Sequence, residues 1–369
     1  VTVKDGKIIS IEVLEQNETK RFWSKAVAVI DSILDKQSTD VDAISGATHS
    51  STAIKEATQN ALANGPIEDE AEEEEITSLS GQGTKDDPYV ISTEKELIFF
   101  RDSVNDGDSY QGEYILQTAD IELTADWTPI GTGKNAPFSG SYDGNNYTIS
   151  NLIVSSDSVA TDGTSYYAGL FGYSTTYADF SDIRLNNVVI DVTDKSGIVY
   201  AGTIVGSMYN TVTNGSEISV VDNCYVSGSI NVGTNSKSTM TGGLVGMSSQ
   251  YSALTNNTVK VSVNVSTDDF MAYVGGIVGM ASINSAIVNN AAIGEVIIQS
   301  NHAMATAGGI VGQAGTCLIY NNYAKADVCA TKSGGVIGNA LNNTWLLADY
   351  YITDKAYGAC TGYVDTDTV

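Results

Sequence analysis

Histidine and cysteine are scarce in this chain of 369 residues. Only His49 and His302 are present and no Cys-x-x-Cys-His segment occurs, which excludes a c-type haem site and an ordinary histidine-rich zinc site. Ser-His-Asp catalysis is nearly excluded for the same reason, so we predict no catalytic residue and no metal ligand. The cysteines lie far apart, and we expect them to be buried free thiols. They are Cys224, Cys317, Cys329 and Cys360.

Basic side chains and long apolar runs are also scarce. Eighteen Lys and Arg stand against 44 Asp and Glu, for a formal net charge of -26. Such a charge repels phosphate backbones at long range, so we expect no nucleic-acid partner. No stretch approaches the roughly 18 apolar residues that span a bilayer, so we predict no transmembrane segment. Valine stands at position 1 and no charged leader precedes an apolar core, so we expect any signal peptide or lipid anchor to be absent from this sequence.

Residues 1–64 have the pattern of a small α+β domain. Positions 1–13 alternate apolar and polar residues around a tight turn, which predicts two short strands. Positions 24–36 place apolar side chains on one stripe after a serine, which predicts an amphipathic helix. Positions 51–62 predict a second helix that starts just after Thr48.

An acidic segment follows this domain. Residues 68–75 hold seven acids in eight positions. Such a run repels itself and cannot bury itself. We therefore place an extended linker at residues 65–80.

Residues 81–369 repeat a Gly-aliphatic cluster and an asparagine with one shared period. Gly246, Gly279 and Gly312 are 33 residues apart. The clusters end at Gly172, Gly206, Gly246, Gly279, Gly312 and Gly338, and the asparagines are Asn187, Asn223, Asn257, Asn290 and Asn322. A period near 33 that carries short strands and no helical pattern predicts a mainly-β domain, a parallel β-solenoid (β-helix), with an opening region at 81–155.

Stacking of such repeats has two consequences for the side chains. The five asparagines are expected to form a ladder of amide hydrogen bonds between successive turns. Ile277 and Val278 are expected on opposite sides of their strand, with one of them in the core.

The segment Asp42-Ala43-Ile44-Ser45-Gly46-Ala47-Thr48 is the most informative short motif. Glycine and alanine let the chain turn tightly, and Thr48 then lies beside the free N–H groups of a helix N-terminus, where a phosphate group is stabilised. The alternative is a simple turn with a Ser or Thr cap, which composition alone favours.

This segment, with Val3-Lys4-Asp5-Gly6-Lys7-Ile8 before it and Ala53-Ile54-Lys55-Glu56-Ala57 after it, resembles the FMN-binding domain family. That family occurs in ion-pumping oxidoreductases and in surface electron-transfer lipoproteins. Its pattern is Asp-x-x-Ser/Thr-Gly-Ala-Thr/Ser, and every fixed position is met. Members usually have a further strand segment upstream of the hairpin, so we expect part of the sheet to be missing.

The resemblance implies a cofactor, its attachment site and a maturation partner. A flavin transferase would join FMN to Thr48 through a phosphoester, with Asp42, Ser45, Gly46 and Ala47 as the recognition sequence. The protein would be an extracytoplasmic flavoprotein that relays electrons between a donor and an acceptor. The β domain would be a spacer or anchor.

The second region is similar to bacterial surface proteins with GLUG repeats. The similarity rests on segments such as Trp127-Thr128-Pro129-Ile130-Gly131 and Phe138-Ser139-Gly140-Ser141-Tyr142, and continues to about Gly338. Such repeats occur in adhesins, which implies a location at the cell surface or in the medium and possible binding of surface glycans or proteins.

Two other functions therefore compete with the electron relay. A cell-surface adhesin or glycan-binding protein would have no redox role. A secreted polysaccharide hydrolase would need paired carboxylates in one groove, whereas Asp191, Glu295 and Asp327 are expected to be isolated. We expect a redox carrier or binding protein rather than an enzyme with its own substrate.

Overall fold

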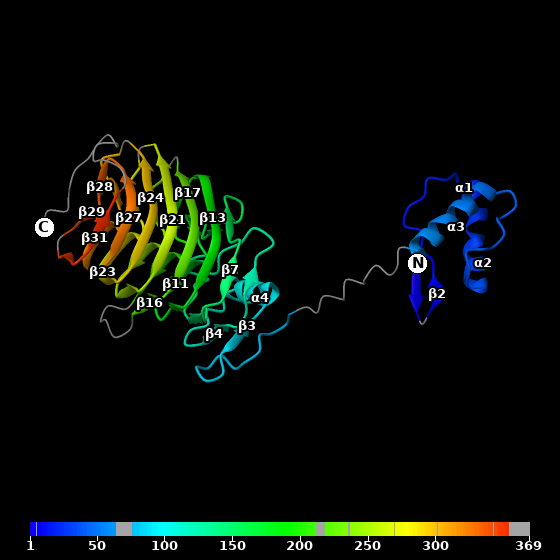
Figure 1. The fold of residues 1–369 in the computed structure, drawn as a ribbon, viewed down its shortest axis with the longest axis horizontal. Coiled ribbons are helices and arrows are strands. Elements are labelled where there is room, and N and C mark those ends of the chain that lie inside the picture. Colours follow the sequence, from blue (N-terminus) through cyan, green and yellow to red (C-terminus); the bar gives the residue numbers. More distant parts are fainter. Residues whose placement is uncertain are drawn as a thin grey trace. The chain divides into compact units, whose positions relative to one another are not determined.

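The chain folds into two compact units, residues 1–75 and 76–369, in a computed structural model (Figure 1). The structure describes residues 1–4, 6–63, 76–211, 218–234, 237–268, 270–300, 302–341 and 343–353. The acidic run 68–75 and Cys360 lie outside the described residues. Each unit is described by itself below.

The first unit pairs a short hairpin with three helices. Strands β1 (Thr2–Lys4) and β2 (Lys7–Ser10) are antiparallel, as the alternation predicts. The helices are α1 (Lys20–Ala26), α2 (Ala28–Lys36) and α3 (Thr48–Ala63). Their small core is formed by Ile8, Ala26, Val29, Ile33, Val41, Ala47 and Ile54.

The helix predicted at residues 24–36 is two helices. Helix α1 begins at Lys20, and Val27 separates it from α2. Val27 is 38% exposed, whereas Ala26 before it and Val29, two residues after it, are fully buried. Both helices therefore contribute apolar side chains to the same core.

The second unit opens with a helix that the sequence analysis did not predict. Strand β3 (Tyr89–Ile91) leads into α4 (Glu94–Asn105), which starts with a capping box between Thr93 and Glu96. Helix α4 buries Leu97, Phe100 and Val104 against the core of the second unit. Short strands complete this opening region. They are β4 (Tyr114–Gln117), β5 (Ile121–Glu122), β6 (Ser141–Asp143), β7 (Thr148–Ser150), β8 (Ile153–Ser155) and β9 (Ala160–Thr161).

Three sheets of mostly parallel strands then curl around one apolar core. The seven-stranded sheet contains β9, β10 (Ser165–Ala168), β14 (Ile198–Ala201), β18 (Thr239–Gly242), β22 (Ala272–Gly275), β25 (Ala305–Gly308) and β28 (Lys332–Gly334). The nine-stranded sheet contains β5, β7, β13 (Arg184–Lys195), β17 (Tyr225–Thr234), β21 (Thr258–Thr267), β24 (Ala291–Gln299), β27 (Tyr323–Cys329) and β31 (Tyr350–Ile352), with β8 beside β13.

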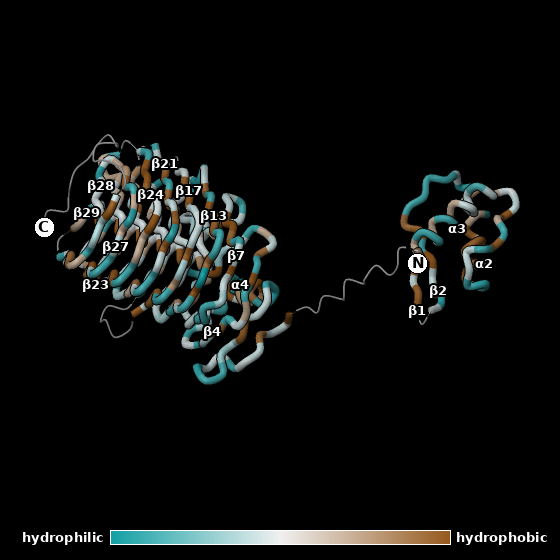
Figure 2. Tube along the Cα trace, viewed as in Figure 1, coloured by the Kyte–Doolittle hydropathy of each residue, from teal (hydrophilic) through white to brown (hydrophobic). Residues whose placement is uncertain are grey.

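The third sheet contains the last two residues of each Gly-aliphatic cluster. Its strands are β3, β4, β6, β11 (Phe171–Thr175), β12 (Asp179–Ser181), β15 (Val205–Tyr209), β16 (Ser219–Asp222), β19 (Val245–Ser249), β20 (Ser252–Thr255), β23 (Val278–Val288), β26 (Val311–Tyr320), β29 (Ile337–Ala340) and β30 (Trp345–Leu347). Polar and apolar segments alternate along each coil (Figure 2).

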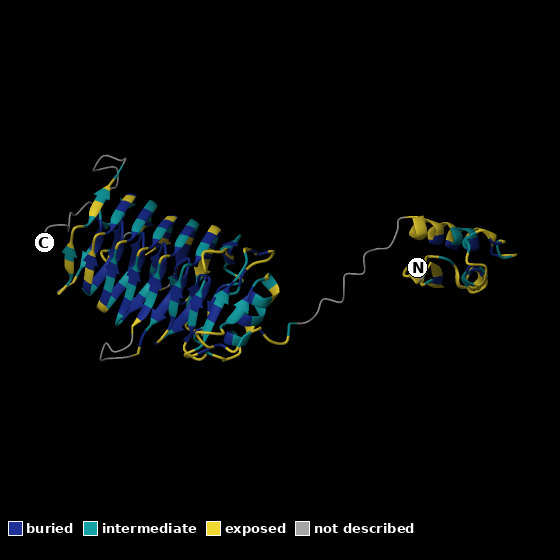
Figure 3. Cartoon of the chain, turned by 60° about the horizontal axis from the view of Figure 1, so that its bottom comes forward, coloured by how far each residue is buried: buried dark blue, intermediate teal, exposed yellow. Residues whose placement is uncertain are grey.

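The strand register follows the sequence period. Val226 lies beside Val259, and Val259 lies beside Ala292, each 33 residues further along the chain. This pairing fits a β-helix-like fold and supports the predicted mainly-β class, while the description as a regular solenoid stays a prediction. Figure 3 shows the buried faces lining the interior of the coils.

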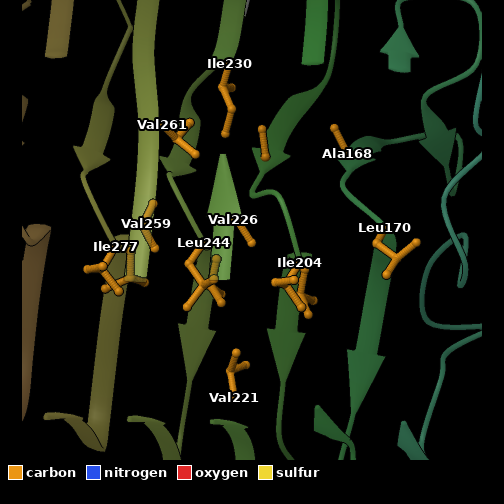
Figure 4. Close-up of a cluster of buried hydrophobic side chains, with 14 of the residues drawn as sticks. Ala168, Leu170, Ile204, Val221, Val226, Ile230, Leu244, Val259, Val261 and Ile277 are labelled. Carbon is orange, nitrogen blue, oxygen red and sulfur yellow. The ribbon is translucent and has the colours of Figure 1, made fainter. Parts of the chain in front are cut away.

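Ile277 and Val278 correct the predicted packing of the Gly-aliphatic cluster. Both side chains are fully buried and belong to the same core. The prediction of opposite sides is wrong because Ile277 precedes β23, where the chain turns between two sheets. Figure 4 shows Leu170, Ile204, Leu244 and Ile277 in one row across successive coils.

The asparagine ladder exists, but only three of the five predicted residues belong to it. Asn257 donates its amide to Asn290 at 2.9 Å, and Asn290 donates to Asn322 at 3.0 Å. Asn223 and Asn187 are exposed and pair instead with Asp182 and Asn151. In the coil before Asn257, Cys224 occupies the ladder position. Its backbone N–H donates a hydrogen bond to Asn257 Oδ1.

The cysteines are not all free thiols. Cys224 and Cys317 are buried and free, as expected. Cys329 is disulfide-bonded, so the expectation is wrong for that residue.

Among the described residues, no helix is both long enough and apolar enough to span a membrane.

Candidate functional site

The segment 42–48 forms a tight turn that leads directly into α3. The N–H of Ala47 donates to the carbonyl oxygen of Ile44 at 3.0 Å, and Gly46 has a φ of +78°, which glycine adopts without strain. Ala47 is buried in the core of the first unit and anchors the turn. Thr48 is the first residue of α3 and is exposed.

The N-terminus of α3 has no side-chain cap among the described residues. The first helical hydrogen bond joins the N–H of Ser51 to the carbonyl of Ala47 at 3.0 Å. The N–H groups of Thr48, His49 and Ser50 therefore precede the first intrahelical bond. Alanine before the helix cannot cap them, so the simple capped turn does not describe this site. Free N–H groups and the helix dipole favour an anion here.

The hydroxyl groups near the helix start differ in availability. Ser50 Oγ donates a hydrogen bond to Glu18 Oε2 at 2.5 Å. This hydrogen bond is the main reason that the pKa of Glu18 is lowered. Ser51 is fully buried, accepts from the N–H of Ile44 at 2.9 Å and donates to the carbonyl of Ala47. Thr48 is the exposed hydroxyl that begins the helix.

The other predicted recognition residues lie on the surface around Thr48. Asp42, Ser45 and Gly46 are exposed, so the turn presents them outward together with Thr48. Within the part of the chain that the structure describes, neither the Asp42 carboxylate nor the Ser45 hydroxyl has a hydrogen bond. Both groups are available to an external protein.

Lys25 joins this site, although the sequence analysis did not select it. A side chain built on Gly46 would place its Cβ 3.6 Å from the Lys25 ammonium. Lys25 is exposed in the last turn of α1, and helices α1 and α3 pack together. No local pattern reveals this approach, because it depends on how two helices far apart in sequence pack.

A hollow of about 590 Å³ lies along α3, starting at Ser50. Ala53, Ala57 and Ala61 give it a floor of small side chains, and Trp23 forms part of its wall. The remaining lining comes from the loop of residues 11–18 and from Val1, Ile54 and Thr58. The hollow is open and mostly apolar, which suits a flat aromatic ring system.

These features fit the parts of FMN. The exposed N-terminus of α3 with Lys25 nearby suits the phosphate, and the apolar hollow beside Trp23 suits the ring system. The residues present are therefore compatible with the cofactor that the motif implies.

The acids considered for hydrolysis are arranged differently from expectation. Glu295 on β24 lies directly beside Asp327 on β27, so these two are not isolated. Asp191 lies beside Asn231, in line with Asn264. Two neighbouring carboxylates on a sheet face do not by themselves form a catalytic site.

Comparison with known families supports the assignment of the first unit. Residues 1–63 match the model of the FMN-binding domain. The match supports an FMN-binding domain in the first unit and FMN as its cofactor.

The curated relatives share only part of their length with this chain. A candidate Gly-rich membrane protein of Evansella cellulosilytica is 32% identical over 141 residues, covering 36% of this chain and 15% of that protein. Halomucin of Haloquadratum walsbyi is 33% identical over 136 residues, covering 35% of this chain and 1% of that protein. The resemblance to GLUG repeats stays a prediction.

A solved structure shares the fold. A candidate immunoglobulin A1 protease from Bacteroides ovatus has a TM-score of 0.55 at 20% identity, covering 77% of this chain and 85% of that chain. At this identity the likeness concerns the fold alone.

Proposed function

We propose that this protein is an extracytoplasmic flavoprotein that carries FMN covalently on Thr48 and relays electrons. The observation that carries the proposal is the exposed Thr48 hydroxyl at the uncapped start of α3, inside a segment that matches the FMN-binding domain. The electron donor and acceptor are separate proteins or small molecules.

Attachment of FMN is a phosphoryl transfer without net oxidation or reduction. The donor must hold the FMN phosphate in a phosphoanhydride, as a flavin dinucleotide does. The Oγ1 of Thr48 forms a bond to the FMN phosphorus, the phosphoanhydride P–O bond breaks, and a nucleoside monophosphate leaves with the electron pair. The hydroxyl proton passes to a base on the flavin transferase. Asp42 and Ser45, both exposed, are contacts for that enzyme.

The chain's own residues bind and orient the cofactor. When bound, FMN supplies one- and two-electron redox chemistry, and the protein supplies position and electrostatics. The free N–H groups of α3 would hold the phosphate, and Trp23 with the alanine floor of the hollow would cover the ring system.

The extracytoplasmic location is supported by the disulfide at Cys329. Disulfides persist in oxidising compartments and are rare where thiols are kept reduced. In that setting the β-helix-like unit serves as a spacer or anchor for the flavin domain.

Co-expression with a flavin transferase, followed by denaturation and intact mass measurement, tests the proposal. Wild-type protein is expected to gain the mass of one covalent FMN. Thr48→Val keeps the side-chain shape but removes the hydroxyl, and it is expected to gain none. Thr48→Ser is expected to retain the modification.

Three variants serve as controls. Ser50→Ala and Ser51→Ala each remove a neighbouring hydroxyl and should leave the modification in place, while Asp42→Ala should lower its yield. Full modification of Thr48→Val would place the acceptor elsewhere and end the proposal.

A second candidate function is supported by exposed aromatic side chains on the last coils. Trp345 is 67% exposed and Tyr350 is 63% exposed. Exposed aromatic rings of this kind stack on sugars, as a surface adhesin requires. Binding of the full chain to a glycan array, lost in Trp345→Ala and present without flavin, would favour this function over the electron relay.

A further inference from the structure

Lys25 lies close to the turn that precedes Thr48, where a positive charge would act on a phosphate bound at the proposed site. Its ammonium lies 3.6 Å from the position of a Cβ on Gly46, in the turn two residues before Thr48. Ala26, the next residue, is fully buried in the core and fixes the end of α1 against the first unit. The lysine stem therefore starts from a rigid point.

The Lys25 ammonium has no ion pair within 4 Å among the described residues. Glu18, an acid that contacts the first turn of α3, accepts hydrogen bonds from Ser50 and from the N–H of Thr19 instead. The whole chain has a formal net charge of -26, so adding a phosphate diester anywhere on it adds like charge. An unpaired cation beside the turn that leads into Thr48 offsets that repulsion locally.

We infer that Lys25 is a positioning residue that holds the FMN phosphate over Thr48. The inference rests on the proposed function and names the side chain that, together with the N–H groups of α3, recognises the phosphate. During attachment Lys25 stabilises negative charge on the phosphoryl oxygens, and afterwards it orients the phosphodiester.

Lys25 also has an ordinary structural explanation. A lysine in the last turn of a helix stabilises the negative end of the helix dipole. Lys36 occupies the same place in α2, is exposed, and lies on a different helix from the one that meets Gly46. It is therefore a matched control, because it has the helix-end role without the site.

The experiment measures the rate of flavin attachment to the full chain at limiting flavin dinucleotide, with purified transferase and intact mass as the readout. Lys25→Met is expected to slow attachment about fivefold, because exposed charge contacts contribute about 1 kcal/mol. Lys25→Arg is expected to recover the rate to within about twofold because it restores the cation. Lys36→Met is expected to match wild type.

A second readout does not depend on the transferase. The ³¹P resonance of the loaded protein is expected to move in Lys25→Met and to stay in place in Lys36→Met, because only Lys25 touches the phosphate. Lys25→Gln provides an independent neutral variant if Lys25→Met alters the far-ultraviolet circular dichroism spectrum.

The outcomes separate this inference from the proposed function. Wild-type rates and an unchanged ³¹P resonance in both neutral Lys25 variants would overturn the role of Lys25 while leaving Thr48 as the acceptor. Equal slowing by Lys25→Met and Lys36→Met would assign a structural role only. Wild-type protein without any covalent flavin would end both.

Discussion

The two units of this protein bury apolar side chains in different ways. The first unit has seven buried apolar residues from three helices, a hairpin and the segment before α3, and most of the turn that precedes Thr48 is exposed. The second unit has one core that runs continuously through its coils, with each coil contacting the next. A small core gives a small domain little stability to spare, whereas stacked coils add to one another. The site that does chemistry is thus proposed for the less stable unit.

The largest expected effect tests the close stacking of coils at Gly276. A Cβ there would lie 2.2 Å from the backbone oxygen of Gly309, which cannot move without displacing a whole coil. We expect Gly276→Ala to lower the free energy of unfolding by about 4 kcal/mol or more. Gly315→Ala is the control, because its Cβ would meet only the Leu341 side chain at 3.5 Å. Denaturant unfolding of both variants makes the measurement. Equal, small losses would show that the coils tolerate spacing changes.

The next test makes matched cavities in the two cores. Ile33 and Ile277 are both fully buried, and truncation of either to alanine is expected to cost about 2 to 4 kcal/mol. Because small domains have only about 5 kcal/mol of stability, Ile33→Ala should leave much of the first unit unfolded, while Ile277→Ala should only lower a transition temperature. Calorimetry that resolves the two transitions distinguishes these outcomes. A first unit that keeps a sharp transition would contradict the comparison.

A smaller effect is expected from the buried asparagine ladder. Asn290 donates to the carbonyl of Leu254 at 2.9 Å and to Asn322 at 3.0 Å. Asn290→Ala leaves buried partners unsatisfied and is expected to cost about 1 to 3 kcal/mol in chemical denaturation. The neighbouring Asn289→Ala, at an exposed position, is expected to cost clearly less. Similar losses in the free energy of unfolding at both positions would show that the buried ladder contributes no more stability than the exposed asparagines.

The smallest effect is a pH dependence that arises from Asp179 in the second unit. Burial raises the pKa of Asp179 from 3.8 to about 6, and its Oδ1 is buried without a hydrogen bond. Because the pKa of Asp179 is higher in the folded state than in the unfolded state, the carboxyl contributes stability below about pH 4. That contribution is lost as the pH rises through about 6. Because the carboxyl is only half-buried, we expect Asp179→Asn to be about 1 kcal/mol more stable than wild type at pH 8. Unfolding of both proteins at pH 4 and pH 8 makes the measurement, and equal stability of the two proteins at pH 8 would contradict the prediction.

The features that could be predicted from the sequence are those with a local or strictly periodic cause. The start of α3 at Thr48 follows from local turn chemistry, and the alignment of coils follows from a repeat of 33 residues. Helix α4 was missed, although its capping box at Thr93 and Glu96 is a local signal that could have revealed it.

Other features depend on packing that no single segment encodes. The approach of Lys25 to Gly46 and the pairing of Glu295 with Asp327 need the positions of separate elements. The ladder was misassigned at Asn223 because neighbouring asparagines form two columns. Asn223 belongs to the exposed column of left-handed residues with Asn256, rather than to the buried one with Asn257.

Helix α4 has a consequence for how the second unit can change in evolution. It covers apolar side chains of the first coils with Leu97, Phe100 and Val104, which shields the core at that end from water. Between the coils, by contrast, the interfaces are alike: β17 pairs with β21 in the same register as β21 pairs with β24. Duplication or loss of one 33-residue coil in this stretch would join surfaces that already match. A change in length by one whole coil would therefore leave the covered end of the β-helix-like unit, and its neighbouring coils, with the same contacts.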